Sequence, residues 1–295
     1  MAAVSQPVAG TAATPGPEWA VGAGVREIRA AEAAGSLRPV DGGWSTTLAS
    51  GESVLFRRLY AGAEFCRHLI PSRAQWTAVL ALARRRRVPV TLRTPPVTEE
   101  ALARLAIVLR ALSGVQGAEV VANDWGTLRL VHRRFPGLRP ILGRCLRRQK
   151  KDPRVGELAM SGAMSPETLD LLARWGVDLV EADCLPDDAS PIALALHLPF
   201  AFVASGSLCL LSGLGRPVEE KFRPDRPCRA PCRGRAVRLH HPACRAPLLL
   251  RENTFFAARG VGGPPLARPD VARLVYDLDT DVDRSFLRPG PVGRP

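Results

Sequence analysis

Several features that would place this chain in a familiar class are missing from its 295 residues. No run of about 18 uncharged apolar residues occurs, which argues against a membrane-spanning helix. The N-terminus has no positively charged segment followed by an apolar stretch, so we expect no signal peptide and a cytoplasmic location. The motifs H-E-x-x-H and G-x-S-x-G are both absent, which removes the common signatures of zinc-dependent peptidases and serine hydrolases.

Lysine is scarce as well. The only lysines are Lys150, Lys151 and Lys221, so arginine carries almost all of the positive charge behind the formal net charge of +13. Such a charge is typical of proteins that bind nucleic acid or another anionic partner. The abundance of arginine, alanine, proline and glycine also fits a compositional bias that raises arginine everywhere. We favour the bias and keep RNA as a secondary expectation.

Seven cysteines, an odd number, disfavour a framework of disulfides in a chain without export signals. Metal binding, redox chemistry and ordinary burial remain as explanations. Four of the seven lie between Cys209 and Cys244.

Proline- and glycine-rich segments without periodicity mark both ends of the chain. We expect residues 1–24 to be disordered and residues 284–295 to form a frayed tail. Residues 25–283 are expected to form one α/β domain, with a cysteine-rich basic loop at 209–246. Residues 36–52 are polar and predict a loop.

Strand and helix patterns alternate through the middle of the chain. Ser72 is a good N-cap for a helix that runs to about Arg86, and Thr98 begins a second helix. Ser165 and Pro166 begin the clearest one. Further elements are a helix at 124–134 and strands at 88–94, 119–122, 138–142, 177–182 and 198–204. This alternation predicts a parallel sheet, either closed as a TIM-like (β/α) barrel, incomplete or irregular at its start, or open and doubly wound.

Four cysteines follow expected strands. These cysteines are Cys66, Cys145, Cys184 and Cys209. In a parallel barrel all four would open onto the C-terminal mouth, where functional sites are built.

Two further cysteines, Cys228 and Cys232, lie in the polar segment RPDRPCRAPCRGR, which can fold back and present both sulfurs to one metal centre. Between Lys221 and Ala246 there are eight Lys/Arg residues and one acid, Asp225. This charge favours thiolates and would offset the negative charge of a four-thiolate cluster. Tetrahedral zinc is the competing metal, although zinc sites usually use two local cysteine pairs and only one exists here.

Three segments together resemble the peptidase U32 family, and within it the UbiV-like branch. They are LYAGAEFCRH (59–68), LHLPFAFVASGSLCLLS (196–212) and CRAPC (228–232). The segment VVANDWGTLRLV (120–131) is similar to the strand-to-helix step of the family. The resemblance covers about residues 53–260, and the opening strand of the family is not recognisable before Val54.

The resemblance implies a TIM-like barrel with a [4Fe–4S] cluster on Cys66, Cys209, Cys228 and Cys232. UbiV-like proteins act in oxygen-independent hydroxylation during ubiquinone biosynthesis, together with a second U32-family protein, the UbiU-like partner. The substrate would then be a small anionic molecule or a quinone precursor. Other branches are implicated in RNA base hydroxylation, and older members are described as collagenase-like peptidases.

Two other features leave alternatives open. His197, at the start of an expected strand near the mouth, has either a functional role or a hydrogen-bonded structural one. The basic segment LRRQKKDPR (146–154) either binds an anionic substrate or an RNA backbone, or forms a polar loop without a partner.

Overall fold

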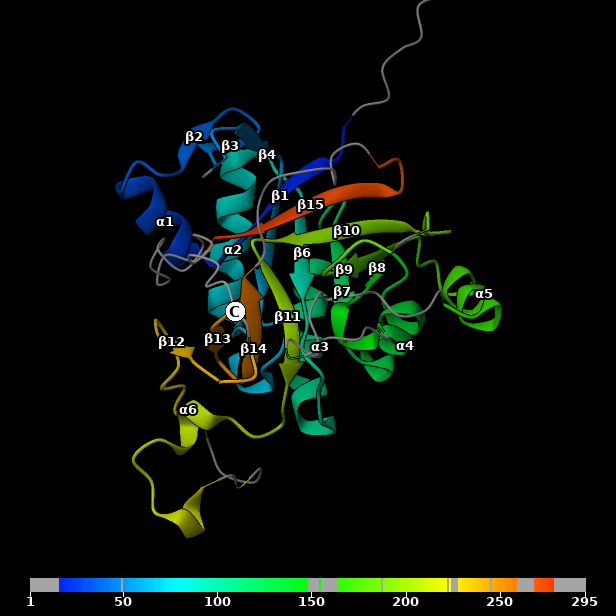
Figure 1. The fold of residues 1–295 in the computed structure, drawn as a ribbon. Coiled ribbons are helices and arrows are strands. Elements are labelled where there is room, and N and C mark those ends of the chain that lie inside the picture. The colour runs from blue at the N-terminus through cyan, green and yellow to red at the C-terminus, as the bar shows by residue number, and fades with distance from the viewer. Residues whose placement is uncertain are drawn as a thin grey trace, which may run out of the picture.

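A closed barrel of eight parallel strands forms the centre of the molecule (Figure 1). This computed structural model describes residues 16–48, 50–147, 154, 164–186, 188–221, 223, 228–244, 246–258 and 268–278. The barrel strands are β1 (Glu18–Gly22), β5 (Arg58–Gly62), β6 (Val90–Arg93), β7 (Glu119–Ala122), β8 (Arg139–Leu142), β9 (Leu179–Ala182), β10 (Ala193–Leu198) and β15 (Val271–Asp277). Their order around the barrel is β1-β15-β10-β9-β8-β7-β6-β5, and β1 pairs with β5 to close it. The prediction of a TIM-like α/β barrel is therefore confirmed, and the open doubly wound sheet is wrong.

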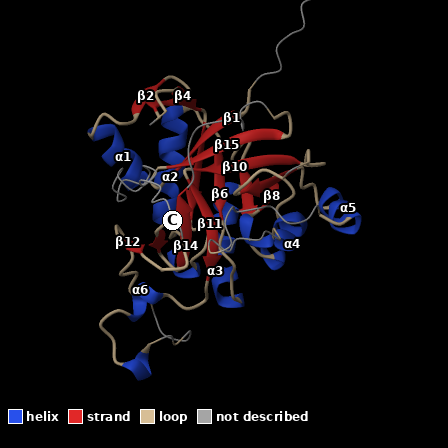
Figure 2. Ribbon diagram, viewed as in Figure 1, coloured by secondary structure: helices blue, strands red, loops and turns tan. Residues whose placement is uncertain are grey.

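Helices lie around the strands (Figure 2). They are α1 (Val25–Ala33), α2 (Arg73–Arg86), α3 (Glu99–Leu112), α4 (Trp125–Arg134), α5 (Pro166–Arg174) and the short α6 (Leu210–Gly213). Three short 3-10 turns cover Arg67–Leu69, Arg144–Leu146 and Val218–Glu220. The expected caps are confirmed: Ser72, Thr98 and Ser165 each accept a hydrogen bond from a backbone N–H of the helix that follows. None of the helices in the described part of the chain combines the length and apolar character that a membrane crossing requires.

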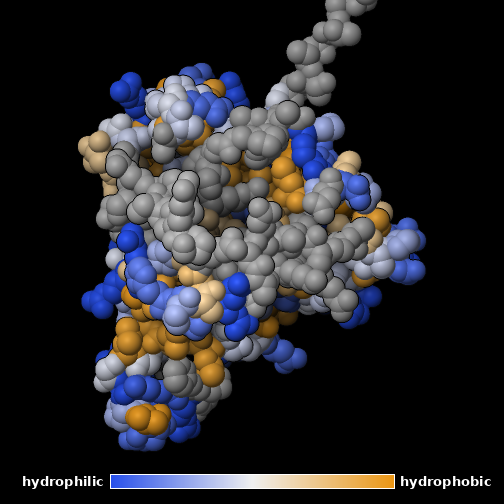
Figure 3. All heavy atoms as spheres, in the orientation of Figure 1, coloured by the Kyte–Doolittle hydropathy of each residue, from blue (hydrophilic) through white to orange (hydrophobic). Residues whose placement is uncertain are grey.

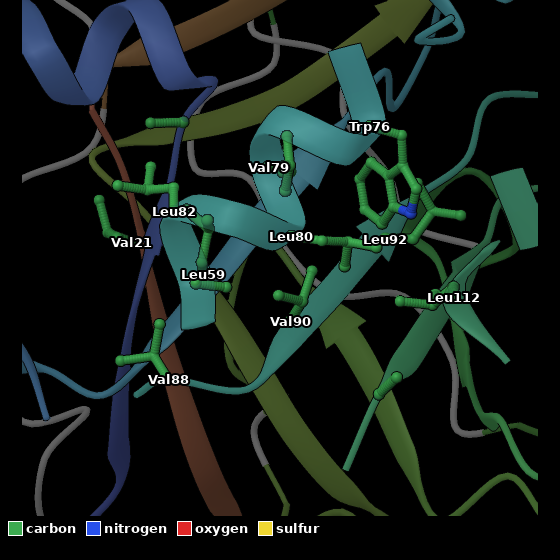
Figure 4. Packing of buried hydrophobic residues seen from close by; sticks show 14 of the residues in the cluster. Val21, Leu59, Trp76, Val79, Leu80, Leu82, Val88, Val90, Leu92 and Leu112 are labelled. Atoms are coloured by element: carbon green, nitrogen blue, oxygen red, sulfur yellow. The ribbon is translucent and has the colours of Figure 1, made fainter. Parts of the chain in front are cut away.

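Helix α2 shows how the outer layer is attached. Trp76, Val79 and Leu80 lie on one face and belong to the same cluster as Val90 and Leu92 of strand β6 (Figure 4). Burial of each such side chain contributes about 1.5–3 kcal/mol. The opposite face carries exposed polar residues, so the hydrophobic stripe sets the orientation of the helix.

The start of the chain differs from the prediction in two ways. Residues 18–24 were expected to be disordered, but Glu18–Gly22 form β1, which pairs with β15 and β5 inside the barrel. Residues 36–52 were expected to be a loop, but they contribute to a three-stranded antiparallel sheet of β2 (Arg38–Val40), β3 (Gly43–Thr47) and β4 (Ser53–Phe56). Trp44 is fully buried there and donates to Glu32 of α1, which explains why a polar segment forms ordered strands. Residues 1–15 and the expected tail at 284–295 lie outside the described residues.

A second departure concerns the single strand expected at 198–204. The structure has two strands here, β10 of the barrel and β11 (Phe200–Ser205), separated by Pro199. Proline has no backbone N–H to donate to a sheet, so it is suited to this boundary. Strand β11 belongs to an added antiparallel sheet ordered β11-β14-β13-β12. The other strands are β12 (Ala236–Leu239), β13 (Leu248–Arg251) and β14 (Thr254–Ala258).

The added sheet is attached at the C-terminal mouth of the barrel. Phe65, which follows β5, stacks on Phe202 of β11 with ring centroids 4.8 Å apart. The Asp183 carboxylate, which follows β9, accepts a hydrogen bond of 2.8 Å from the backbone N–H of Phe202. The sheet is therefore fixed to the mouth by both apolar packing and a buried polar contact.

Candidate functional site at the barrel mouth

The interior of the barrel consists of three layers, because alternate residues of each strand point inward. On β15, Arg273, Val275 and Asp277 belong to the lower, middle and upper layers in turn. The middle layer is an apolar cluster of Ala20, Tyr60, Val121, Ile141, Leu179, Ala195 and Val275. Charged groups therefore occupy two separate networks, one toward the N-terminal end of the strands and one at the mouth.

The lower network is centred on Glu119. Its carboxylate accepts hydrogen bonds from Arg273 (2.7 and 3.1 Å), Arg139 (2.8 Å) and the Thr91 hydroxyl (2.7 Å). Burial works to raise the pKa of Glu119, but the hydrogen bond and charge of Arg273 outweigh it and hold the pKa below its usual value. The carboxylate is thus charged and fully compensated.

The upper network is centred on Arg144, which follows β8. Its guanidinium donates two hydrogen bonds to Glu64, of 2.7 and 2.6 Å, and one of 2.9 Å to Asp183. Arg93 donates to Asp277 at 2.6 Å and lies 3.7 Å from the Glu64 carboxylate. All five side chains come from the carboxyl ends of barrel strands or the residues that follow, where TIM-type barrels place their chemistry.

His197 and Glu181 complete this network and are both completely buried. The His197 Nδ1 atom lies 3.3 Å from an Asp277 oxygen, and its Nε2 atom lies 3.0 Å from Glu181 Oε1. Burial and Arg144 act to lower the pKa of His197, but the carboxylates of Glu181 and Asp277 outweigh them and raise it to about 9. Burial also raises the pKa of Glu181 itself. The expectation that His197 begins a strand is wrong, since it is near the end of β10.

A cavity of about 640 Å³ opens above this network. Arg93 and Asp277 form part of its floor, and Gly22 and Gly62 lie beside them. A side chain at Gly22 would meet an Asp277 oxygen at 2.3 Å, so glycine leaves the room that the Arg93–Asp277 pair occupies. Its other charged lining residues are Arg26, Glu27, Arg29, Arg233, Arg235, Arg251 and Glu252.

The four predicted cysteine ligands line a second cavity, of about 270 Å³. Cys66, Cys209, Cys228 and Cys232 all contribute to its wall, and Cys232 also lines the larger cavity. Burial raises the pKa of Cys66 to about 11 and that of Cys232 to about 12, and the neighbouring thiols add to both shifts. The side chains are thus close enough for the charge of one thiolate to affect another.

Backbone N–H groups point at three of these sulfurs. The amides of Leu211 and Ser212 donate to Cys209, and the amide of His68 donates to Cys66. The amide of Ala230 donates to Cys228 Sγ at 3.3 Å. Such donors are typical of protein sites that stabilise thiolate ligands.

The structural elements that carry these cysteines differ from the prediction. Cys66 follows barrel strand β5, as expected, but Cys209 follows β11 of the added sheet. Cys228 and Cys232 lie between β11 and β12 of that sheet. The Asn253 amide connects the two parts, since it donates to the backbone carbonyls of Phe65 and Gly206.

The remaining cysteines separate into two kinds. Cys145, to which the sequence assigned no role, also lines the cysteine cavity, and its backbone N–H donates to Asn123. Cys184 and Cys244 are half-buried and do not appear in its wall. Of the basic segment 146–154, only Leu146, Arg147 and Arg154 lie within the described residues.

The sequence interpretation missed the charged network at the mouth. Its members other than His197 are Glu64, Arg93, Arg144, Glu181, Asp183 and Asp277. A signal was available: Glu181 and Asp277 each interrupt an apolar run near the end of a strand. An acidic residue at such a place is costly unless it has a partner, so it indicates a buried charged site.

Comparison with known proteins finds no family description that matches the chain, and no similar curated protein or solved structure. The resemblance to the U32 family accordingly stays a prediction from the sequence.

Proposed function

We propose that the protein holds a [4Fe–4S] cluster on Cys66, Cys209, Cys228 and Cys232 and takes part in an oxygen-independent hydroxylation of the UbiV-like type, the branch that acts in ubiquinone biosynthesis. The observation that carries the proposal is that these four cysteines, which come from three separate places in the sequence, line one cavity at the barrel mouth. When bound, such a cluster supplies electron transfer at a potential set by its surroundings.

The donor set fits this group better than it fits zinc. No three cysteine sulfurs among the described residues lie within 4.8 Å of one another. A tetrahedral zinc site requires closer sulfurs, because each Zn–S bond is only about 2.3 Å long. Each thiolate of a [4Fe–4S] cluster binds a different iron atom, so the sulfurs are held further apart.

The adjoining cavity supports a small anionic substrate or quinone precursor. Arg93 and Arg251 line it, and Cys232 belongs to its wall as well as to the cysteine site. A guanidinium binds a carboxylate in a bidentate manner, which would orient the substrate beside the cysteine site. The role assigned to these arginines is binding and orientation, not proton transfer.

Apolar side chains next to Cys209 support a protein partner, which we propose is a second U32-family protein of the UbiU-like type. Leu208, Leu210, Leu214 and Val218 are all exposed, the last to 81%. Figure 3 shows apolar surface in the same part of the molecule as α6. Exposed apolar groups that cluster in this way mark interaction surfaces.

An RNA-modifying role of U32 type is the alternative, and the exposed arginines of the cysteine loop favour it. Arg229, Arg233 and Arg235 face solvent beside the cavity. RNA affinity that falls steeply with salt would support this alternative, because phosphate contacts release counterions. Absence of RNA binding at low salt would exclude it.

The first experiment is anaerobic purification followed by iron and labile-sulfide analysis. We expect a brown protein with about four irons and four sulfides per chain. Cys228→Ala should lose the cluster, whereas Cys244→Ala, a matched substitution outside the cavity wall, should keep it. Colourless wild-type protein that binds only zinc would contradict the proposal, as would a cluster retained by Cys228→Ala.

A further inference from the structure

Glu64, Glu181 and His197 form the only group of three metal-ligating side chains in the described part of the chain whose donor atoms all lie within 4.8 Å of one another. All three are buried, Glu181 and His197 completely. They come from three different positions around the barrel: the residues after β5, strand β9 and strand β10. The barrel therefore fixes the relative positions of these donors.

Two members of this trio have ligand atoms without a hydrogen-bond partner. Neither oxygen of the Glu181 carboxylate has one, and neither does His197 Nε2. The Nε2 and Oε1 atoms lie 3.0 Å apart and form an ion pair when the imidazole is protonated. Buried polar atoms without partners are costly, and three of them facing one another indicate that a ligand is expected between them.

The formal charge of the network points to a divalent cation. Four carboxylates are joined by contacts in this network: Glu64, Glu181, Asp183 and Asp277. Among the contacts that the described residues make within this network, two guanidinium groups, Arg93 and Arg144, oppose them. A metal at Nε2 displaces the proton that the carboxylates favour on His197, and these groups with neutral His197 then have a formal charge of −2. One divalent ion would neutralise it.

His197 is also oriented as a metal ligand would be. Its Nδ1 atom lies against the Asp277 carboxylate, which leaves Nε2 directed at the Glu181 carboxylate. A carboxylate behind a histidine is the usual means of fixing a metal-binding imidazole. Glu64 already accepts two hydrogen bonds from Arg144, but a carboxylate offers about four lone-pair sites, so an oxygen of Glu64 remains able to bind a metal.

We propose that Glu64, Glu181 and His197 bind one divalent transition-metal ion, Mn²⁺, Fe²⁺ or Zn²⁺, with Asp277 as the positioning residue for His197. One imidazole and two carboxylates are a donor set suited to these ions. The site is distinct from the cysteine cavity and does not depend on the proposed cluster. Three protein ligands leave coordination positions for water or an oxygen-bearing ligand. The Arg93–Asp277 pair connects this site with the cavity of about 640 Å³ above it.

The test uses Mn²⁺ as the probe, because thiolates are poor ligands for this hard ion and the cysteines will not compete. The full-length protein is stripped with a chelator, desalted and titrated with Mn²⁺, and the bound ion is followed by electron paramagnetic resonance. We expect one Mn²⁺ per chain, with a nitrogen coupling from the imidazole that disappears in His197→Gln. Glu181→Gln should weaken binding by at least about 100-fold, and Asp277→Asn by about 10–100-fold.

Two controls separate this site from the others. Glu119→Gln changes a buried carboxylate of the lower network and should bind Mn²⁺ as the wild type does. Cys228→Ala removes a proposed cluster ligand and should also leave Mn²⁺ binding unchanged. Circular dichroism checks that each variant folds. If Glu181→Gln does not fold, the Mn²⁺ affinity of Asp277→Asn tests the proposal instead. No binding at about 1 mM Mn²⁺, unchanged affinity in the folded ligand variants, or loss of binding in Cys228→Ala would each overturn the proposal.

Discussion

The two charged networks inside the barrel both pair arginines with buried carboxylates, but they differ in how completely their polar atoms are paired. In the lower network, Glu119 accepts hydrogen bonds from Arg273, Arg139 and Thr91, and Arg58 bonds to Glu18. In the upper network, Glu181, His197 and the Nε atom of Arg93 have buried polar atoms without partners. None of the unpartnered buried atoms found among the described residues belongs to the lower network.

This difference indicates that the lower network contributes to stability and that the upper network is the candidate functional site. An apolar layer that includes Tyr60 and Val275 lies between the networks, so their charges are not shared through direct contacts. The lower network closes the end of the barrel where TIM-type folds keep structural residues. The upper network lies below a cavity and keeps polar atoms free to receive a ligand. A buried polar atom without a hydrogen-bond partner is therefore a better indicator of a functional site than a buried charged group that is fully paired.

Arg144→Met should give the largest effect on stability. The guanidinium is 1% exposed and holds Glu64 and Asp183, so its loss leaves two carboxylates buried without their main partner. Removal of one member of a buried charged group typically costs about 3–5 kcal/mol. Urea unfolding followed by circular dichroism measures the change in the free energy of unfolding.

The control for this prediction is Arg26→Met. Arg26 is 67% exposed and pairs with Glu27 at the surface, where such ion pairs contribute between about 0 and 1 kcal/mol. If Arg144→Met and Arg26→Met lowered the free energy of unfolding by similar amounts, the upper network would not be a buried charge network.

Some of this organisation could be predicted from the sequence. Local signals were sufficient for the helices, because caps such as Ser72 and Thr98 and the apolar stripe of α2 depend on neighbours along the chain. The barrel followed from the alternation of elements. Strand β1 was missed because its five residues lie within the segment 1–24 that is rich in alanine, proline and glycine, and their pairing with β15 spans almost the entire chain.

The candidate sites were predictable to different degrees. The four cysteines could be selected from spacing and resemblance, and the structure places them around one cavity. Their arrival from an added sheet could not be foreseen, because it depends on the division of one apolar stretch into β10 and β11 at Pro199. The upper network was not predicted, since its charged residues are far apart in sequence and meet only when the barrel closes.

Glu119→Gln should give the second largest effect, a loss of about 2–3 kcal/mol near neutral pH, since Arg58, Arg139 and Arg273 would lose their shared carboxylate. The folded-state pKa of Glu119 lies below its unfolded value of about 4.3. Its contribution is therefore fully present above about pH 4.3 and is lost as the pH falls through the folded-state pKa. Urea unfolding between pH 3 and pH 7 should show the two proteins converging in acid.

A stability difference between wild type and Glu119→Gln that stayed constant down to pH 3 would show that the lost contribution is steric and not electrostatic. Glu99→Gln is the matched control, because Glu99 is an exposed residue at the start of α3. Its stability change should stay within about 1 kcal/mol, as expected for a surface charge near a helix N-terminus.

Glu181→Gln should give the smallest effect, because two contributions oppose each other. In chelator at pH 8, burial disfavours the charged form of the wild-type carboxylate and raises its pKa, and neither of its oxygens has a hydrogen-bond partner. A neutral amide of the same shape removes that penalty, but it also removes the negative partner that lies 3.0 Å from the imidazole of His197. We therefore expect the free energy of unfolding to change by less than about 1 kcal/mol. A loss as large as that of Glu119→Gln would show that Glu181 is as well paired as Glu119, and the contrast between the two networks would fail. Because the same isosteric change is made in both layers, the size of its effect measures how completely each carboxylate is paired.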